Sequence, residues 1–243
     1  MSIIQAAGSG EVSTGFYSHL LDQSLKFNDD DAQYLKRTPA SDGNRKTLTW
    51  SAWVKRSSLS GSNYPRLFCG HTNGQNRVEF YFKPTDELQC EIVIGNTGRN
   101  LVTTRKFRDL SAWYHIVLQA NTSTLKVYVN SVEQSSKSIS GNGEINNTSA
   151  QVIGKYANTT TDYFDGYMSE INFVDGSAKA PTDFGETNDN GVWIPKKYTG
   201  SHGTNGFYLE FKQTGTSQNS SGIGADTSGN DNHFAVTNLA ATD

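Results

Sequence analysis

The sequence predicts an all-β antiparallel β-sandwich with an extended N-terminal arm. Short apolar runs with a period of two recur from residue 24 onward, as expected for half-buried strands. Each run is bounded by Gly, Pro, Asn or Asp, the residues that form tight turns. Hydrophobic residues make up only 35% of the 243 residues and no long 3.6-residue period occurs, so helix content should be low. Aromatic residues, at 11%, can still supply large buried surfaces.

The chain divides into an arm over residues 1–22 and one sandwich domain over residues 23–243. Glycines at positions 8, 10 and 15 interrupt the short apolar start, which prevents a regular period there. The first expected strands are residues 25–27, 47–54, 66–69, 77–82, 88–94 and 101–104. Trp50 and Trp53 should project to opposite sides of their strand, because they are three residues apart.

A β-hairpin is predicted where residues 113–120 and 125–130 flank the turn-forming residues 121–124. Alternation places one set of apolar side chains toward the core: Tyr114, Ile116, Leu118, Leu125, Val127 and Val129. The opposite face carries Trp113, His115, Lys126 and Tyr128. This set is unusually aromatic for a surface that contacts only solvent. This face should therefore contact a ligand or lie beneath covering loops.

Beyond the hairpin, Trp193 and residues 206–211 predict a return strand that joins the same sandwich. An Asx-rich turn over residues 226–232 follows it. Short helical turns are expected near residues 109–111 and 178–181.

Charge and cysteine usage exclude several classes of protein. The net charge is −3 and no Lys/Arg block occurs, which argues against a nucleic-acid partner. The sequence has no 18-residue apolar run and no signal peptide, so we expect no membrane insertion and synthesis in the cytoplasm. Cys69 and Cys90 lack C-x-x-C spacing, and we expect buried free thiols rather than a disulfide.

Four segments in order resemble laminin-G-like domains of the concanavalin A-like lectin and glucanase kind. They are residues 48–55 (LTWSAWVK), 112–117 (AWYHIV), 125–129 (LKVYV) and 163–173 (YFDGYMSEINF). The last segment carries the aromatic-x-Gly-x-x-x-Glu-hydrophobic pattern of the family's late strand. The resemblance implies a jelly roll of the concanavalin A-like type.

The C-terminal part resembles laminin-G-like virion proteins of phages, especially marine ones, over residues 193–200, 203–211 and 226–234. This resemblance implies a non-catalytic structural protein on the virion surface, made in the host cytoplasm. Its expected partners are other virion proteins, further copies of the chain and host surface glycans. A tail fibre or spike component that binds glycans is the leading hypothesis, and a capsid decoration protein that coats or stabilises the head is the alternative.

The arm should attach the sandwich to a neighbouring subunit. Its apolar residues Ile3, Ile4, Phe16 and Leu20 would be buried on docking, which would offset the entropy lost when the arm orders. The alternative is that the arm folds back on its own sandwich.

Carbohydrate recognition requires aromatic platforms for the apolar faces of sugars. The candidates are Trp53, Trp113, His115, Tyr128, Tyr156, Trp193 and Tyr198. For each of them, packing in the core is the alternative role.

Catalysis is the minor alternative. Glycosidases of this fold class carry alternating carboxylates on one strand, and Glu87, Gln89 and Glu91 share a face while Leu88 and Cys90 point inward. Gln89 stands where a titrating Asp would be needed, so an ordinary solvated strand face is favoured over a glycoside hydrolase site. No Gly-x-Ser-x-Gly elbow or nucleotide-binding Gly-rich loop occurs.

Calcium is the metal that the Asx-rich turn predicts, because hard cations prefer oxygen ligands. The candidate ligands are Asp226, Asn230 and Asp231. An Asx-rich turn that satisfies its own amides is the alternative.

Overall fold

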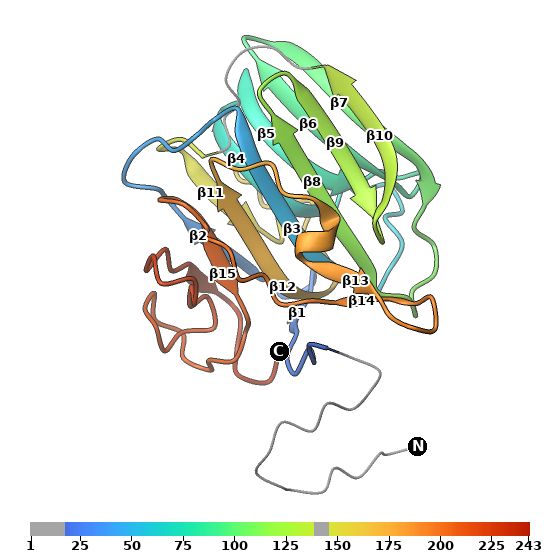
Figure 1. Ribbon diagram of the computed structural model, residues 1–243. Helices are drawn as coiled ribbons and strands as arrows, with labels where there is room; N and C mark the ends of the chain where they lie inside the picture. The colour runs from blue at the N-terminus through green and yellow to red at the C-terminus, as the bar shows by residue number, and fades with distance from the viewer. Residues whose placement is uncertain (1–17, 139–145) are drawn as a thin grey trace, which may run out of the picture.

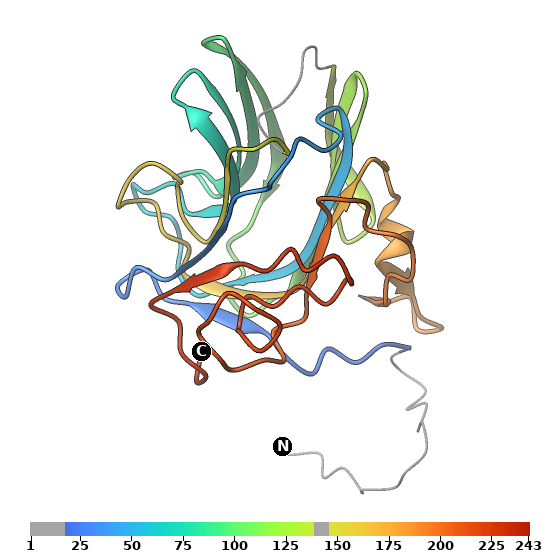
Figure 2. The ribbon, with the colours of Figure 1, turned by 90° about the vertical axis from the view of Figure 1, so that its left-hand side faces the viewer.

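The computed structural model describes residues 18–138 and 146–243, which form two stacked antiparallel sheets of seven strands each (Figures 1 and 2). The predicted all-β sandwich is therefore confirmed. The single helix among the described residues is η1 (Pro181–Asp183), which is three residues long. No described helix thus has the length and apolar character needed to cross a membrane.

In the first sheet, β12 (Gly166–Asp175) pairs with one long strand on one side and with two short strands, placed end to end, on the other. The order of the sheet is β1 (Leu25–Phe27), β12, β3 (Thr47–Arg56), β8 (Tyr114–Asn121), β9 (Thr124–Val129) and β10 (Val132–Ser138), with β15 (Phe207–Leu209) also on β12. A bulge between Ser169 and Asn172 separates the two short partners, and Glu170 within it has a φ of 52°. β1 pairs before the bulge and β15 after it.

The second sheet contains the long meander of the chain. Its order is β16 (Ala235–Thr237), β2 (Tyr34–Arg37), β11 (Ala150–Ile153), β4 (Arg66–Asn73), β5 (Asn76–Phe82), β6 (Glu87–Ile94) and β7 (Thr97–Lys106). All six early runs predicted from alternation are strands, namely β1 and β3 to β7.

The core lies between the sheets and is rich in aromatic rings. The indole of Trp50 is fully buried, 6.3 Å from the ring of Phe68 and 5.7 Å from that of Phe80. Trp53, on the same strand, lies on the outer face as predicted from parity. The predicted hairpin is confirmed as β8 and β9, whose register pairs the core residues Ile116 with Val129 and Leu118 with Val127, and so keeps one apolar face toward the core.

A covering segment lies on the outer face of the first sheet. It contains η1 and a two-stranded sheet of β13 (Gly185–Thr187) and β14 (Trp193–Pro195), and Figure 2 shows it outside the two main layers. Its side chains Phe184 and Tyr198 pack with Val117 and Val174, and we call these four residues the outer cluster.

Two predictions about the late part of the chain need correction. The predicted return strand is present as β15, but Trp193 belongs to the small sheet and not to the sandwich, because β14 pairs only with β13. The helical turn expected at residues 178–181 is shifted to η1, where Pro181 occupies the first position of the helix. Residues 109–111 form a turn without helix.

One buried charge stabilises the loops at one end of the sandwich. The Arg56 side chain is fully buried, and its guanidinium donates hydrogen bonds to Asp86 at 3.1 Å, the carbonyl of Phe107 at 2.7 Å and Ser60 at 2.9 Å. Its charged plane also lies 4.5 Å from the centre of the Phe82 ring. Burial lowers the pKa of Arg56, while the Asp86 carboxylate opposes that shift.

Both cysteines are buried free thiols, as expected. Cys90 packs in the core, whereas Cys69 lies near Glu79 in the second sheet. Burial raises the pKa of Cys69 to about 12, so this thiol is not ionised near neutral pH.

Candidate functional site

A cavity of about 420 Å³ opens between the outer face of the first sheet, strand β14 and the segment that leads into β1. Three of the four tryptophans of the chain line it: Trp53, Trp113 and Trp193. The remaining lining residues are His19, Leu20, Leu21, Asp22, Gln23, Ser24, Ser169, Val192, Ile194 and Pro195. We call this cavity the tryptophan pocket.

Two of its indoles stack on the same imidazole. Trp53 and His115 face each other across β3 and β8, with ring centres 5.0 Å apart and planes inclined by 21°. Trp193 stacks on His115 at 5.9 Å and 25°. The result is a stack in which a histidine from the sandwich connects an indole of the sheet to an indole of the covering segment.

Hydrogen bonds fix the protonation state of His115. The indole N–H of Trp193 donates to Nδ1 of His115 at 3.1 Å, so Nδ1 carries a lone pair and the proton resides on Nε2. Nε2 then donates to the hydroxyl of Ser51 at 2.9 Å. Burial lowers the pKa of His115 to about 3, and the side chain is only 1% exposed. His115 is therefore a neutral positioning residue beneath the pocket surface.

The small sheet accommodates the indole of Trp193 because Gly185, which lies against the ring, has no side chain. A Cβ atom on Gly185 would lie 2.5 Å from the ring of Trp193, closer than such contacts occur. Gly185 pairs with Pro195 in the register of β13 and β14, which brings the indole across it. Glycine is thus required at this position for close approach.

Trp113 is the most open of the three indoles. It directly precedes β8 and is 37% exposed, compared with 7% for Trp53. The ring of Tyr167 lies 6.3 Å from it at an angle of 58°. One face of Trp113 is supported by the protein while the side chain remains available to a ligand.

A further wall of the pocket is formed by residues 18–24, which precede β1, and residues 19–24 of this wall line the cavity. The hydroxyl of Ser169 donates to the carbonyl of Gln23 at 2.6 Å. Nε2 of His19 lies 3.1 Å from Oε2 of Glu170, and the same oxygen accepts a hydrogen bond of 2.5 Å from the hydroxyl of Tyr208. The bulge in β12 aims Glu170 at this wall, so the irregularity of the strand has a positioning role.

A further contact attaches the start of the wall to the covering segment, because the hydroxyl of Ser18 donates to the carboxylate of Glu186. Alternation alone missed this wall, since it contains no regular strand. The late-strand pattern that ends in Glu170 was the one signal in the sequence that marked a residue of this network.

The structure brings together four of the predicted carbohydrate-binding candidates: Trp53, Trp113, His115 and Trp193. Tyr198 belongs to the outer cluster and Tyr128 packs against it, so both have packing roles under the covering segment. Tyr156 lies on the second sheet, away from the pocket, where its hydroxyl is 3.3 Å from Nε2 of His71.

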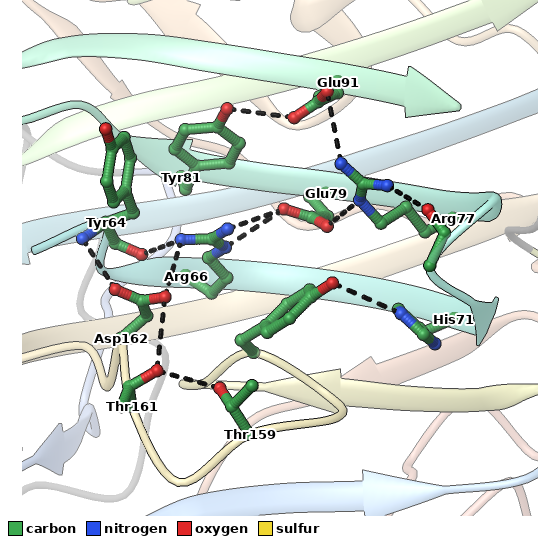
Figure 3. A network of polar contacts seen from close by, with 12 residues as sticks. Tyr64, Arg66, His71, Arg77, Glu79, Tyr81, Glu91, Thr159, Thr161 and Asp162 are labelled. Carbon is green, nitrogen blue, oxygen red and sulfur yellow. Dashed lines mark hydrogen bonds and ion pairs between the residues drawn. The ribbon is translucent and has the colours of Figure 1, made fainter. Parts of the chain in front are cut away.

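A second group of polar side chains lies on the outer face of the second sheet (Figure 3). The guanidinium of Arg66 contacts Glu79 through two hydrogen bonds of 3.2 and 2.8 Å. Arg77 forms ion pairs with Glu79 at 2.5 Å and with Glu91 at 3.4 Å. The hydroxyl of Tyr81 donates to Glu91 at 3.1 Å. We call these five residues the arginine–glutamate cluster.

This cluster bears on the predicted catalytic alternative. Glu79 and Glu91 face each other in the register of β5 and β6, and sequence reasoning had not considered Glu79. A glycosidase needs one protonated carboxyl group and one available carboxylate. Both glutamates here are paired with arginines, and Glu79 is 1% exposed, so the geometry favours a structural role.

Glu87, the other glutamate of that alternative, is the first residue of β6. Its carboxylate accepts a hydrogen bond from the hydroxyl of Thr85 and lies 3.3 Å from Nζ of Lys106. These contacts hold the pKa of Glu87 below its usual value, which is opposite to the shift that a general acid requires.

The Asx-rich turn uses its carboxylate to accept backbone hydrogen bonds. Asp226 accepts from the N–H groups of Tyr208 at 2.8 Å, Ser228 at 2.9 Å and Asn232 at 2.9 Å. The side-chain amide of Asn230 donates to the carbonyls of Gly203 and Gly206. Asp231 points to solvent with its side chain 87% exposed.

Calcium binding at this turn stays a prediction. Within residues 18–138 and 146–243, no three His, Cys, Asp or Glu side chains gather as they would around a metal ion. The bonds of Asp226 are those expected for the self-satisfied alternative.

Most of the predicted anchoring residues lie outside the described part of the chain, namely Ile3, Ile4 and Phe16. Leu20 is described, and it is 43% exposed beside the tryptophan pocket.

Comparison with known proteins identifies the family. The family model described as "Concanavalin A-like lectin/glucanases superfamily" (Laminin_G_3) matches residues 29–182, which is more than half of the chain. A search of curated protein sequences finds no match.

Solved structures share the fold at low sequence identity. A putative carbohydrate binding protein from Bacteroides ovatus is 14% identical, with a TM-score of 0.59 over 88% of this chain and 57% of that one. The binding domain of botulinum neurotoxin serotype G is 12% identical, with a TM-score of 0.51 over 66% of this chain and 40% of that one. A heptameric SAP-like pentraxin from Limulus polyphemus is 17% identical, with a TM-score of 0.50 over 65% of this chain and 77% of that one.

Proposed function

The chain belongs to the concanavalin A-like lectin/glucanases superfamily, and we propose that it is a non-catalytic glycan-binding protein whose site is the tryptophan pocket. The observation that carries this proposal is the convergence of Trp53, Trp113 and Trp193 on one open cavity beside polar side chains. These indoles come from three separate segments of the chain, so their meeting is a property of the fold.

The chemistry of the pocket suits a sugar. A pyranose ring has an apolar face of C–H groups and a rim of hydroxyls, so it needs an aromatic platform and a few hydrogen-bonding groups. The cavity volume of about 420 Å³ lies within the range of roughly 300–1,000 Å³ that is usual for small-molecule sites. Trp113 supplies the open platform, and Asp22 and Gln23 on the wall supply polar groups.

The carboxylates of the second sheet support the non-catalytic part of the proposal. Glu79 and Glu91 are compensated by arginines, and Glu87 is held ionised by its neighbours. Hydrolysis would therefore require these pairs to be broken before a sugar could be protonated. No release of reducing sugar from β-glucans is expected.

The test is a glycan array probed with the wild type, Trp113→Ala and a matched control, Tyr64→Ala. Tyr64 is an aromatic side chain of similar exposure, 41%, in the loop that leads into β4 of the other sheet. Truncating an aromatic anchor typically costs about 2 kcal/mol of binding free energy, so Trp113→Ala should weaken binding about thirtyfold. Tyr64→Ala should bind like the wild type, and circular dichroism should show that both variants are folded.

Two outcomes contradict the assignment. Loss of binding in Tyr64→Ala with retention in Trp113→Ala would move the site to the arginine–glutamate cluster. Reducing-sugar release that disappears in Glu87→Gln or Glu91→Gln would replace a binding protein with a glycoside hydrolase.

For the setting of this activity, we propose display in multiple copies on a phage particle, on a tail fibre or spike. The support is the resemblance of the C-terminal segments to phage virion proteins. Repeated display would strengthen weak single-site binding through multivalency. Cryo-electron imaging of particles labelled with a specific antibody tests the location, and label on the head combined with an empty glycan array would favour a capsid decoration protein instead.

The anchoring arm can be tested separately from the pocket. Because residues 18–24 form the pocket wall, the deletion should stop at residue 17. Reduced incorporation of the shortened chain into particles, with glycan binding retained, is the result expected for an anchor. Unchanged incorporation would remove the anchoring role.

A further inference from the structure

The titratable side chains that line the tryptophan pocket are one carboxylate and one histidine that contacts a carboxylate. Asp22 is the carboxylate among the lining residues, and the described lining contains no Lys or Arg. His19 is the other titratable group there, and its ring lies against Glu170 at 3.1 Å. Glu186 adds another carboxylate at the outer end of the wall, beside Ser18.

Two further basic groups near the pocket do not offset that pattern. His115 is buried, with one ring nitrogen accepting from Trp193 and the other bonded to Ser51, so it is neutral. Lys55, two residues from Trp53 on β3, extends its ammonium group to 5.8 Å from the centre of the Tyr167 ring and is not among the lining residues.

Two hydrogen-bond donors of the pocket lining are already engaged within the protein. The indole N–H of Trp193 donates to His115, and the hydroxyl of Ser169 donates to the carbonyl of Gln23. The hydroxyl of Tyr208 donates to Glu170 behind the wall. An anionic group depends on such donors or on a cation, whereas a sugar hydroxyl can itself donate to the Asp22 carboxylate.

We propose that the tryptophan pocket selects uncharged glycans and discriminates against sialylated, sulfated and uronic-acid-containing ones. This inference rests on the proposed function, and it adds the chemical class of ligand. Trp113 and its neighbouring indoles supply affinity that does not depend on charge, and Asp22 supplies the discrimination. A negatively charged sugar would meet a like charge and no free basic partner among the described lining residues.

The experiment uses the full chain on an array in which each neutral oligosaccharide is printed beside its sialylated, sulfated or uronic counterpart. Neutral members should bind more strongly than their anionic counterparts, by roughly fivefold or more at low salt. In Asp22→Asn this ratio should shrink toward one, because the variant keeps the side-chain shape and removes the charge. Added salt should shrink the ratio in the wild type but not in the variant.

The outcomes distinguish a failure of the proposed selectivity from a failure of the proposed glycan binding. Equal or stronger binding of anionic glycans that is lost in Trp113→Ala would keep the pocket as the site and overturn the selectivity. A neutral preference that is unchanged in Asp22→Asn and insensitive to salt would also overturn it. The absence of any bound glycan would overturn the proposed function itself.

Discussion

Replacing His115 with phenylalanine should remove a defined part of the acid sensitivity of the fold. An imidazole in the unfolded chain takes up a proton below about pH 6.5, whereas burial lowers the pKa of His115 in the folded protein to about 3. Between these values the unfolded state binds more protons, so stability falls as the pH falls. Phenylalanine retains an aromatic ring between Trp53 and Trp193 and does not titrate.

The structure sets the size of this effect. The separation of the two pKa values corresponds to a ceiling of about 5 kcal/mol, which is reached only near pH 3. Between pH 7 and pH 4.5 the contribution of His115 amounts to about 2.5 kcal/mol. At pH 7 the variant should itself be less stable, by about 1–3 kcal/mol, because the indole N–H of Trp193 loses its acceptor.

The measurement is urea-induced unfolding of both proteins at pH 7 and pH 4.5. The wild type should lose about 2.5 kcal/mol more than His115→Phe across this interval. Other titrating groups are common to both proteins and cancel in the difference. Equal losses in the two proteins would show that His115 is solvated or charged in the folded state, and would refute the stacked, neutral arrangement beneath the pocket.

Three further predictions follow from other contacts. Arg56→Met should lower the free energy of unfolding by about 3–5 kcal/mol in a denaturant titration, because it leaves the buried Asp86 carboxylate with only the exposed Arg108 as a charged partner; a loss below 1 kcal/mol would contradict this. Gly185→Ala should displace Trp193 and weaken glycan binding about tenfold, with little change in the circular dichroism spectrum of the protein. Unchanged affinity would refute the requirement for glycine. Asp226→Asn should lower the melting temperature, while EDTA or calcium should shift the wild type by less than about 1 °C; a clear rise with calcium would establish a metal site instead.

Alternation of side chains was sufficient to predict the sandwich and its core. Trp50 and Trp53 differ in parity, and the structure buries the first between the sheets and places the second on the outer face. The hairpin of β8 and β9 has the predicted register because a slip by one residue would expose its entire apolar face.

The pocket depends on contacts that have no local signal. Trp193 reaches His115 only because the covering segment folds across the first sheet. The packing within the outer cluster holds the segment there. Pairing between distant segments also determines the short strands β2 and β11 and the bulge at Glu170, so these features have no local signal either. Sequence analysis therefore selected several aromatic residues of the pocket without indicating that they meet, and it gave His115 no positioning role.

The wall of the pocket also constrains when the pocket can exist during synthesis. His19 and Glu170 are 151 positions apart, and Ser18 and Glu186 are 168 positions apart. A chain that leaves the ribosome from its N-terminus produces the wall first and the covering segment much later. The pocket therefore cannot be complete until translation has passed β14, whose Trp193 is one of its three indoles.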